Sequence, residues 1–170
     1  MKKIILIVLF AVLSMNAMAK IKVTSGSADC MRENAIAVVV FDYSEATYDM
    51  DQSYEKWCGE DFVERVEKSA SEFIKAFNKE SKGLKISQQS NEAKYRITFK
   101  VGNCDQYTGM NCNWGQMRFK CSGIISVTEI STGKEVCVLT VDKEKSDCDY
   151  TPLDRIAECF AEVGKFLARQ

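Results

Sequence analysis

Histidine is absent from this chain of 170 residues. Its absence excludes the Ser-His-Asp and Cys-His nucleophile systems, and it removes the commonest zinc and copper ligand. It also removes the side chain best suited to proton transfer at neutral pH. Enzyme activity is therefore uncertain, and a non-catalytic function is favoured.

Closely spaced cysteines are absent too. No two of the eight cysteines are nearer than eight positions, so the sequence has no Cys-x-x-Cys motif. Zinc sites usually contain ligands about two to four residues apart, so we expect no bound metal and no cofactor. The formal net charge is only −1, and nothing in the composition predicts binding to nucleic acid.

The start of the chain has the pattern of an export signal. An initial pair of lysines precedes an apolar run at residues 4–13, and Ala17-Met18-Ala19 is a cleavage signal of small residues. The apolar run is too short to span a bilayer. We therefore expect cleavage after Ala19, export to the periplasm or outside the cell, and no transmembrane segment in the remaining chain.

The even number of cysteines in an exported chain predicts disulfide bonds. Eight cysteines can pair in too many ways for the connectivity to be deduced. Cys58, in the sequence WCGE before an expected helix, also fits a reactive thiol with a lowered pKa, although a disulfide partner is the simpler interpretation. The disulfide candidates are Cys30, Cys58, Cys104, Cys112, Cys121, Cys137, Cys148 and Cys159.

Apolar runs and alternations predict the strands of one sheet. Residues 35–43 are continuously apolar, which suits a central strand covered on much of both faces. Residues 95–101 and 117–130 alternate between apolar and polar side chains, and residues 84–87 are expected to form a short strand. Residues 20–34 form a polar lead-in segment that could add a short edge strand.

A tight hairpin is expected at residues 131–133, where Gly133 would take the left-handed conformation. This loop places Ile130 opposite Lys134. Counting outward gives two apolar pairs, Val127 with Cys137 and Ile125 with Leu139. The apolar side chains then share one face, as the register of a half-buried sheet requires.

Two amphipathic helices are predicted from apolar side chains at helical spacing. The first covers residues 60–78, with the stripe Phe62, Val63, Val66, Ala70, Phe73, Ile74 and Phe77. The second covers residues 151–170, with Thr151 as its cap and Pro152 at its first position. Its stripe comprises Leu153, Ile156, Phe160, Val163 and Leu167.

The order of these elements predicts an α+β fold. We expect a two-layer sandwich in which a mixed, mostly antiparallel sheet of four or five strands carries both helices on one face. A small barrel with external helices is the alternative. The chain then divides into a signal peptide at residues 1–19, the lead-in segment at residues 20–34 and a single α+β domain at residues 35–170.

This order resembles that of small exported bacterial proteins of the β-α-β-β-β-α kind. The residues that carry the resemblance are AIAVVVFDY, the helix after it, YRITFKV, the ISVTEISTGKEV hairpin and the closing helix. Similar domains occur in envelope assembly proteins, such as the amino-terminal domain of TolB and the curli secretion lipoprotein. The resemblance implies a binding function in the cell envelope.

Two segments carry aromatic side chains suited to recognition. Residues 103–116, NCDQYTGMNCNWGQ, are expected to form a long hairpin loop anchored by Cys104 and Cys112, and residues 43–57 form a long mixed connection. Exposed aromatic side chains favour protein interfaces, although these could instead pack over the sheet. The candidate binding residues are Tyr48, Tyr54, Trp57, Tyr107, Met110 and Trp114.

Acidic clusters give weaker signals. Asp42, Glu45, Asp49 and Asp51 could supply the paired carboxylates of a glycoside hydrolase, if the fold holds two of them close together. Residues 142–149 contain four acids but lack the glycine and glutamate of a calcium loop. That second cluster is interpreted as a solvated turn.

Together these features predict an exported, disulfide-stabilised, non-catalytic binding domain of the bacterial envelope. We expect it to engage a protein partner through residues 43–57 and 103–116. Two alternatives stay open: a secreted inhibitor or immunity protein that blocks an enzyme, and a carboxylate hydrolase that uses the region from Asp42 to Asp51.

Overall fold

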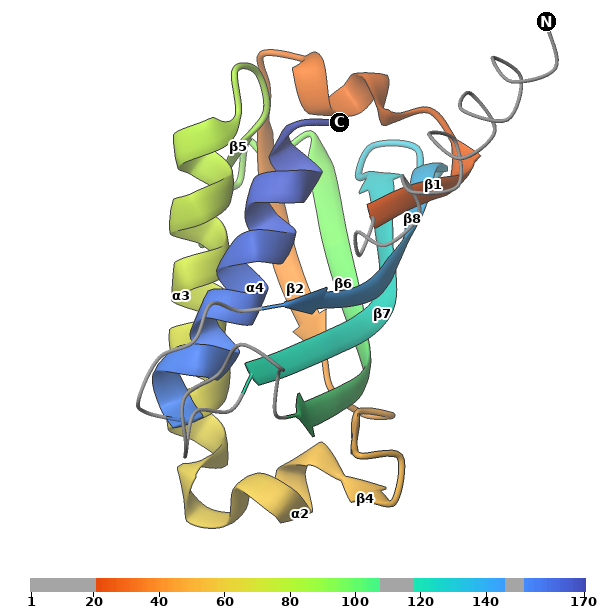
Figure 1. Ribbon diagram of the computed structural model, residues 1–170. Coiled ribbons are helices and arrows are strands. Elements are labelled where there is room, and N and C mark those ends of the chain that lie inside the picture. The colour runs from red at the N-terminus through yellow and green to blue at the C-terminus, as the bar shows by residue number, and fades with distance from the viewer. Residues whose placement is uncertain (1–20, 108–117, 146–151) are drawn as a thin grey trace, which may run out of the picture.

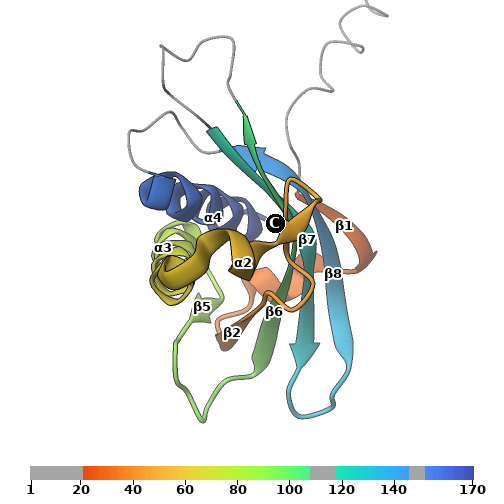
Figure 2. The ribbon, with the colours of Figure 1, turned by 90° about the horizontal axis from the view of Figure 1, so that it is seen from below.

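The computed structural model describes residues 21–107, 118–145 and 152–170. Within these ranges the elements are β1 (Ile21–Gly26), the 3-10 helix η1 (Ala28–Arg32), β2 (Ile36–Asp42), β3 (Thr47–Tyr48), β4 (Gln52–Ser53), α2 (Tyr54–Cys58), the 3-10 helix η2 (Gly59–Asp61), α3 (Phe62–Glu80), β5 (Lys85–Ile86), β6 (Tyr95–Tyr107), β7 (Arg118–Glu129), β8 (Glu135–Lys145) and α4 (Pro152–Ala168). Figures 1 and 2 show two layers, with α3 and α4 side by side on one face of the sheet.

The sheet is mixed and mostly antiparallel. Its main path runs β1-β8-β7-β6-β2-β5, and the short β3–β4 hairpin joins β6 through β3. β2 is parallel to β5 and β6, and β3 is parallel to β6. The other pairs are antiparallel, so the predicted α+β arrangement with its mixed sheet is confirmed.

The predicted number of four or five strands is wrong, because the sheet formed by the described residues has eight strands. β3 and β4 contain two residues each, and alternation becomes a usable signal only over about four residues or more. β3 and β4 are joined by a tight turn, and β3 pairs with the backbone of β6. The lead-in segment supplies β1, which pairs with β8 at one edge of the sheet.

The β7–β8 hairpin has the predicted apolar register. Val127 lies opposite Cys137, and Ile125 lies opposite Leu139. Gly133 has a φ of 67°, as the predicted loop requires.

The predicted pairing of Ile130 with Lys134 is wrong. The register shifts beyond Val127, and the backbone N–H of Glu129 donates to the carbonyl of Lys134 at 2.9 Å. An extra residue in one strand of a hairpin, a β-bulge, produces such a shift, and counting outward from the loop cannot anticipate it.

α3 and α4 pack against each other and against the sheet. The predicted stripe of α3 is correct for Phe73 and Phe77, which are fully buried, and wrong for Val63, which is 63% exposed. Gly164 of α4 lies against α3, and a Cβ atom at this position would come within 2.5 Å of the Phe73 carbonyl oxygen. The two helices therefore approach closely at Gly164.

Aromatic rings fill the space between the layers. Phe99 of β6 lies at their centre, with ring centroids 6.1 Å from Phe41, 6.3 Å from Phe73 and 5.6 Å from Phe160. These rings come from the sheet, α3 and α4. Phe99 therefore links all three parts of the core.

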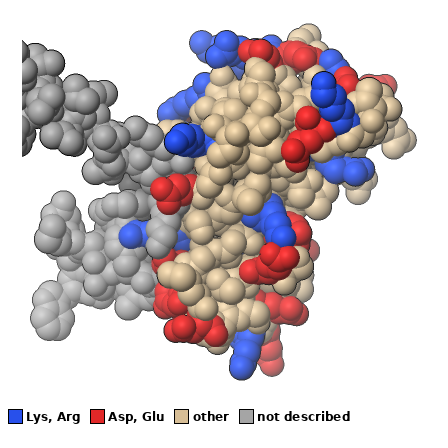
Figure 3. Space-filling view, turned by 90° about the vertical axis from the view of Figure 1, so that its right-hand side faces the viewer, with Lys and Arg blue, Asp and Glu red and all other residues tan. Residues whose placement is uncertain are grey.

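The opposite face of the sheet is partly exposed. Val40 of β2 is 46% exposed and Ile124 of β7 is 49% exposed, so the predicted coverage of β2 on much of both faces does not extend to Val40. Figure 3 views the molecule from the side away from α3 and α4, and most of the surface in view is uncharged.

None of the helices in the described part of the chain is both long enough and apolar enough to cross a membrane.

Candidate functional site

Three of the six predicted binding residues gather at one end of the sandwich. Tyr48 belongs to β3, and Tyr54 and Trp57 belong to α2, which lies at the lower end of Figure 1. Tyr107 ends the described part of β6. Met110 and Trp114 lie outside the described residues, as do the candidate cysteines Cys112 and Cys148.

A strained turn joins β3 to β4. Asp49 and Met50 have φ values of 50° and 65°, and the backbone N–H of Asp51 donates to the carbonyl of Tyr48 at 3.1 Å. Two central residues with positive φ define a type I′ turn, in which glycine, asparagine and aspartate are the usual residues. Asp49 fits this pattern, whereas Met50 does not, and the Met50 side chain is 71% exposed.

Asn103 of β6 anchors this turn to the sheet. Its side-chain oxygen accepts hydrogen bonds from the hydroxyl of Thr47 at 3.0 Å and from the backbone N–H of Met50 at 2.8 Å. The backbone N–H of Asp49 also donates to the carbonyl of Cys104 at 2.9 Å. The main sheet therefore fixes the position of Met50.

Tyr48 and Trp57 form a stacked pair beside the turn. Their ring centroids are 4.1 Å apart with an angle of 7° between the ring planes. The guanidinium of Arg65 lies 5.1 Å from the centroid of the Trp57 ring, a favourable cation–π arrangement. Both aromatic rings are only partly buried. We call the exposed parts of Tyr48, Met50 and Trp57 the corner surface.

Tyr54 supports the corner surface from inside. It is 1% exposed, and its ring lies 5.7 Å from both Tyr43 and Trp57. Tyr54 therefore cannot contact a partner directly, in contrast to its predicted role. The buried side chains of α2, Tyr54 and Cys58, lie on the side of this five-residue helix that packs against the hydrophobic core.

Acidic side chains surround the corner surface. Exposed acids within residues 49–61 are Asp49, Asp51, Glu55, Glu60 and Asp61, whereas Lys56 is the one basic residue there. Figure 3 shows acidic groups gathering at this lower end of the molecule. The surface is thus apolar, and acids outnumber bases near it, although Asp61 is paired with Arg65 at 3.1 Å.

Burial changes the titration of the tyrosines near this end. It raises the pKa of Tyr48 to about 12, with smaller contributions from the charges of Asp49, Asp105 and Cys104. Burial also raises the pKa of Tyr43 and Tyr54 far above the ordinary value. Both groups therefore stay protonated in the folded protein at pH values where the unfolded chain ionises.

We expect these tyrosines to make the protein less stable in alkali. In the unfolded chain a tyrosine has a pKa of about 10, so the contribution of Tyr54 is fully present below about pH 10 and decreases as the pH rises toward the folded value. The urea midpoint should fall above about pH 10. In Tyr54→Phe the fall should be shallower, and an unchanged slope in that variant would contradict the assignment.

Cys58 does not have the environment of an activated thiol. It is 7% exposed, and burial raises its pKa against the lowering effect of a hydrogen bond from Tyr54. A nucleophilic cysteine needs a lowered pKa and solvent access. The position suits a structural cysteine.

The carboxylates at the end of β2 make local contacts. Asp42 Oδ1 accepts a hydrogen bond from the backbone N–H of Ser44 at 2.9 Å, and the hydrogen bonds from Ser44 lower its pKa. Glu45 forms an ion pair with Lys100 at 2.8 Å. A general acid of a glycoside hydrolase needs a raised pKa, which Asp42 does not have.

Among the described residues, no group of three or more cysteine or acidic side chains could hold a metal ion. Of the acidic cluster at 142–149, Asp147 and Asp149 lie outside the described part of the chain.

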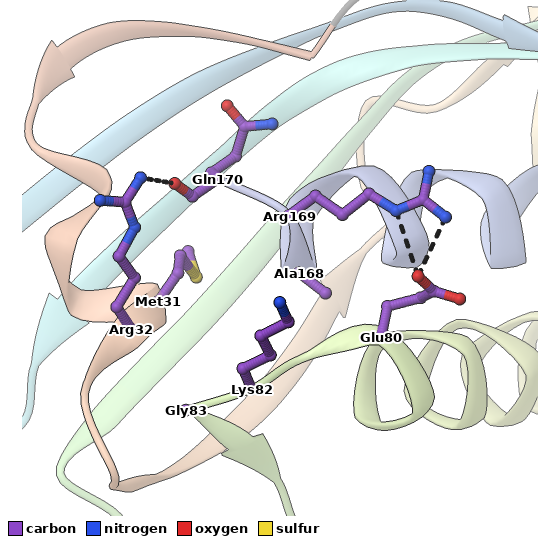
Figure 4. Close-up of a pocket in the computed structure, with 8 residues that line it drawn as sticks. All are labelled: Met31, Arg32, Glu80, Lys82, Gly83, Ala168, Arg169 and Gln170. Carbon is purple, nitrogen blue, oxygen red and sulfur yellow. Dashed lines mark hydrogen bonds and ion pairs between the residues drawn. The ribbon is translucent and has the colours of Figure 1, made fainter.

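A hollow of about 400 Å³ lies at the other end of the helical layer. Figure 4 shows Arg32, Lys82 and Arg169 around it, with Met31 at its base. Arg32 donates to the main-chain oxygen of Gln170 at 2.9 Å, and Arg169 donates to Glu80 at 2.9 and 3.2 Å. These contacts connect the carboxyl-terminal end of the chain to η1 and α3. Arg32 and Arg169 therefore have structural contacts within the protein.

No family model matches the chain, and no curated protein matches it. Among solved structures, a PelC dodecamer from Paraburkholderia phytofirmans has a TM-score of 0.46 at 16% identity, covering 86% of this chain and 96% of its own. A DUF330 protein from Xanthomonas campestris has a TM-score of 0.43 at 11% identity, covering 89% and 92%. A neuraminyllactose-binding hemagglutinin homolog from Helicobacter pylori has a TM-score of 0.36 at 13% identity, covering 79% and 82%. These scores carry no argument about function, and the resemblance to envelope assembly domains stays a prediction.

Proposed function

We propose that this chain is an exported, disulfide-stabilised, non-catalytic domain that binds a protein partner in the bacterial envelope. The contact is the corner surface of Tyr48, Met50 and Trp57. Its partner presents an apolar patch with basic residues beside it, because the corner surface is apolar and exposed acids outnumber bases within residues 49–61.

The conformation of Met50 is the observation that supports this proposal most strongly. A left-handed residue other than glycine costs roughly 1–2 kcal/mol, and such strain is often found at functional sites. Here a methionine takes that conformation with 71% of its side chain exposed. Glycine would relieve the strain with little loss of buried surface, so the fold alone does not account for the methionine side chain.

The environment of Met50 suits recognition. Methionine adapts its shape to an apolar partner surface, and the stacked Tyr48 and Trp57 rings provide rigid area beside it. The hydrogen bonds that Asn103 accepts from Thr47 and Met50 hold this surface in place before binding, which lowers the entropy cost of association.

Replacing Met50 with glycine should separate stability from binding. We expect Met50→Gly to raise the free energy of unfolding by about 0.5–1 kcal/mol, as the relief of strain exceeds the added entropy of the unfolded chain. We expect binding to the envelope partner to weaken by about tenfold or more. Urea denaturation and binding measured on the same preparations would test both.

Asp49→Gly is the matched control. It changes the same turn and keeps the methionine but removes one nearby acid, so it should stabilise the protein by less than Met50→Gly does and weaken binding by much less than tenfold. Equal loss of binding in both variants would show that the turn conformation, and not the Met50 side chain, makes the contact.

The partner can be identified by a photoreactive residue at position 50. We expect it to crosslink one envelope protein in intact cells, whereas the same residue at position 130, which is 41% exposed in the native chain, should not. An enzyme as the crosslinked protein would favour the inhibitor alternative. Identical products from both positions would argue against the corner surface.

A further inference from the structure

The six cysteines in the described ranges are all buried. Cys30 and Cys137 lie near the β1 edge of the sheet, where Gly26 of β1 pairs with Cys137. The other four lie toward the end that carries the corner surface: Cys58 at the end of α2, Cys104 on β6, Cys121 on β7 and Cys159 on α4.

Cys121 and Cys159 face each other across the two layers. Their Sγ atoms are 3.4 Å apart, and each residue is 1% exposed. Cys121 projects from the sheet toward the helices, and Cys159 projects from α4 toward the sheet. A small change in side-chain torsion would bring the two sulfur atoms to bonding distance.

Cys104 is the competing partner of Cys121, because the two residues lie opposite each other in the β6–β7 pair. Opposite residues in an antiparallel pair have Cβ atoms about 4.5–5.5 Å apart, whereas a disulfide prefers about 3.5–4.5 Å. Sheet geometry therefore disfavours that bond. The direct sulfur contact favours Cys159.

We propose that Cys121 and Cys159 are joined by a disulfide in the exported protein, fastening α4 to β7. The inference rests on the proposed export, because thiols stay reduced in the cytoplasm.

The bond forms by thiol–disulfide exchange with an oxidised disulfide donor of the exported compartment. The thiolate of one cysteine attacks a donor sulfur, which forms a mixed disulfide and releases one donor thiolate. The second cysteine, as its thiolate, attacks the protein sulfur of that mixed disulfide and expels the other donor thiolate. Two electrons pass to the donor, and its two thiolates take up the two protons lost by the cysteines. Because the native sulfur atoms are buried, exchange takes place before folding is complete.

Peptide mapping can test this pairing directly. Trypsin would place Cys121 on the peptide 121–134 and Cys159 on the peptide 156–165, while Cys58, Cys137 and Cys148 fall on three others. The protein recovered from the exported fraction is denatured, alkylated without reduction and digested. We expect peptides 121–134 and 156–165 to be linked and to separate on reduction.

The variant Cys159→Ala provides the matched measurement. It should expose Cys121 to alkylation in the denatured, unreduced protein, whereas Cys137 should show no change. Alkylation of both Cys121 and Cys159 in the native sequence would overturn the proposal, as would a link between peptides 121–134 and 101–118, which carries Cys104 and Cys112.

Failure of export and failure of pairing give different results. Recovery of the protein in the cytoplasm with residues 1–19 still attached would contradict the proposed export but not the proposed pairing. The pairing is then decided by refolding the purified, reduced protein in a mixture of oxidised and reduced glutathione. Absence of the linked peptides after refolding would overturn the pairing by itself.

Discussion

Replacing Phe99 with alanine should lower the free energy of unfolding by about 3–5 kcal/mol. Phe99 is fully buried, and its ring contacts Phe41 of the sheet, Phe73 of α3 and Phe160 of α4. Loss of the ring would leave a cavity lined by the sheet, α3 and α4. These three parts of the core cannot all move inward to fill it. Urea denaturation followed by circular dichroism would measure the change.

Ile124→Ala is a suitable control because it lies in the neighbouring strand on the opposite face of the sheet. Its side chain is 49% exposed, so we expect a change within about 0.5 kcal/mol. Similar losses in the two variants would mean that the core is not centred on Phe99.

The oxidised protein should be more stable than the double variant Cys121→Ala/Cys159→Ala by about 5 kcal/mol, of which about 4 kcal/mol is the loop-closure entropy expected for the 38-residue separation and about 1 kcal/mol is side-chain packing. The bridge restricts the unfolded chain and has little effect on the packing of the native state. The difference in urea midpoint between the two proteins gives the measurement.

The same comparison in a reducing buffer provides the control. There the native sequence has no bridge, so its advantage should shrink to about 1 kcal/mol of side-chain packing. An advantage that persists undiminished after reduction would exclude the bridge as its origin.

The regular elements could be predicted because each extends over enough residues for its pattern of apolar side chains to be recognised. The alternating residues of β6 and β7 and the stripe of α3 mark one buried face each, and Gly133 specifies the hairpin loop. The burial of Val63 and Val40 was predicted wrongly because an apolar residue at the right spacing is buried only if another element packs against it. Coverage depends on neighbouring elements, which a periodic pattern does not describe.

The corner surface could be predicted only in part. Tyr48 and Trp57 stand out by composition, but their stacking depends on α2, which begins at a short Ser53 cap, where the Lys56 N–H donates to the hydroxyl at 3.3 Å. Nothing in the sequence DMD at residues 49–51 predicts a left-handed methionine. The role of Asn103 was also missed, since the two hydrogen bonds that it accepts from the turn join residues more than fifty positions apart in the sequence.

The pairing of β1 with β8 has a consequence for how the chain matures. Ile21 lies opposite Val141, so the earliest strand to be synthesised must wait for one of the last. Contacts so distant in sequence form slowly, and until then the backbone N–H and C=O groups of β1 have no partner strand. During synthesis from the amino terminus, β1 therefore stays an unpaired strand until the residues of β8 have been added.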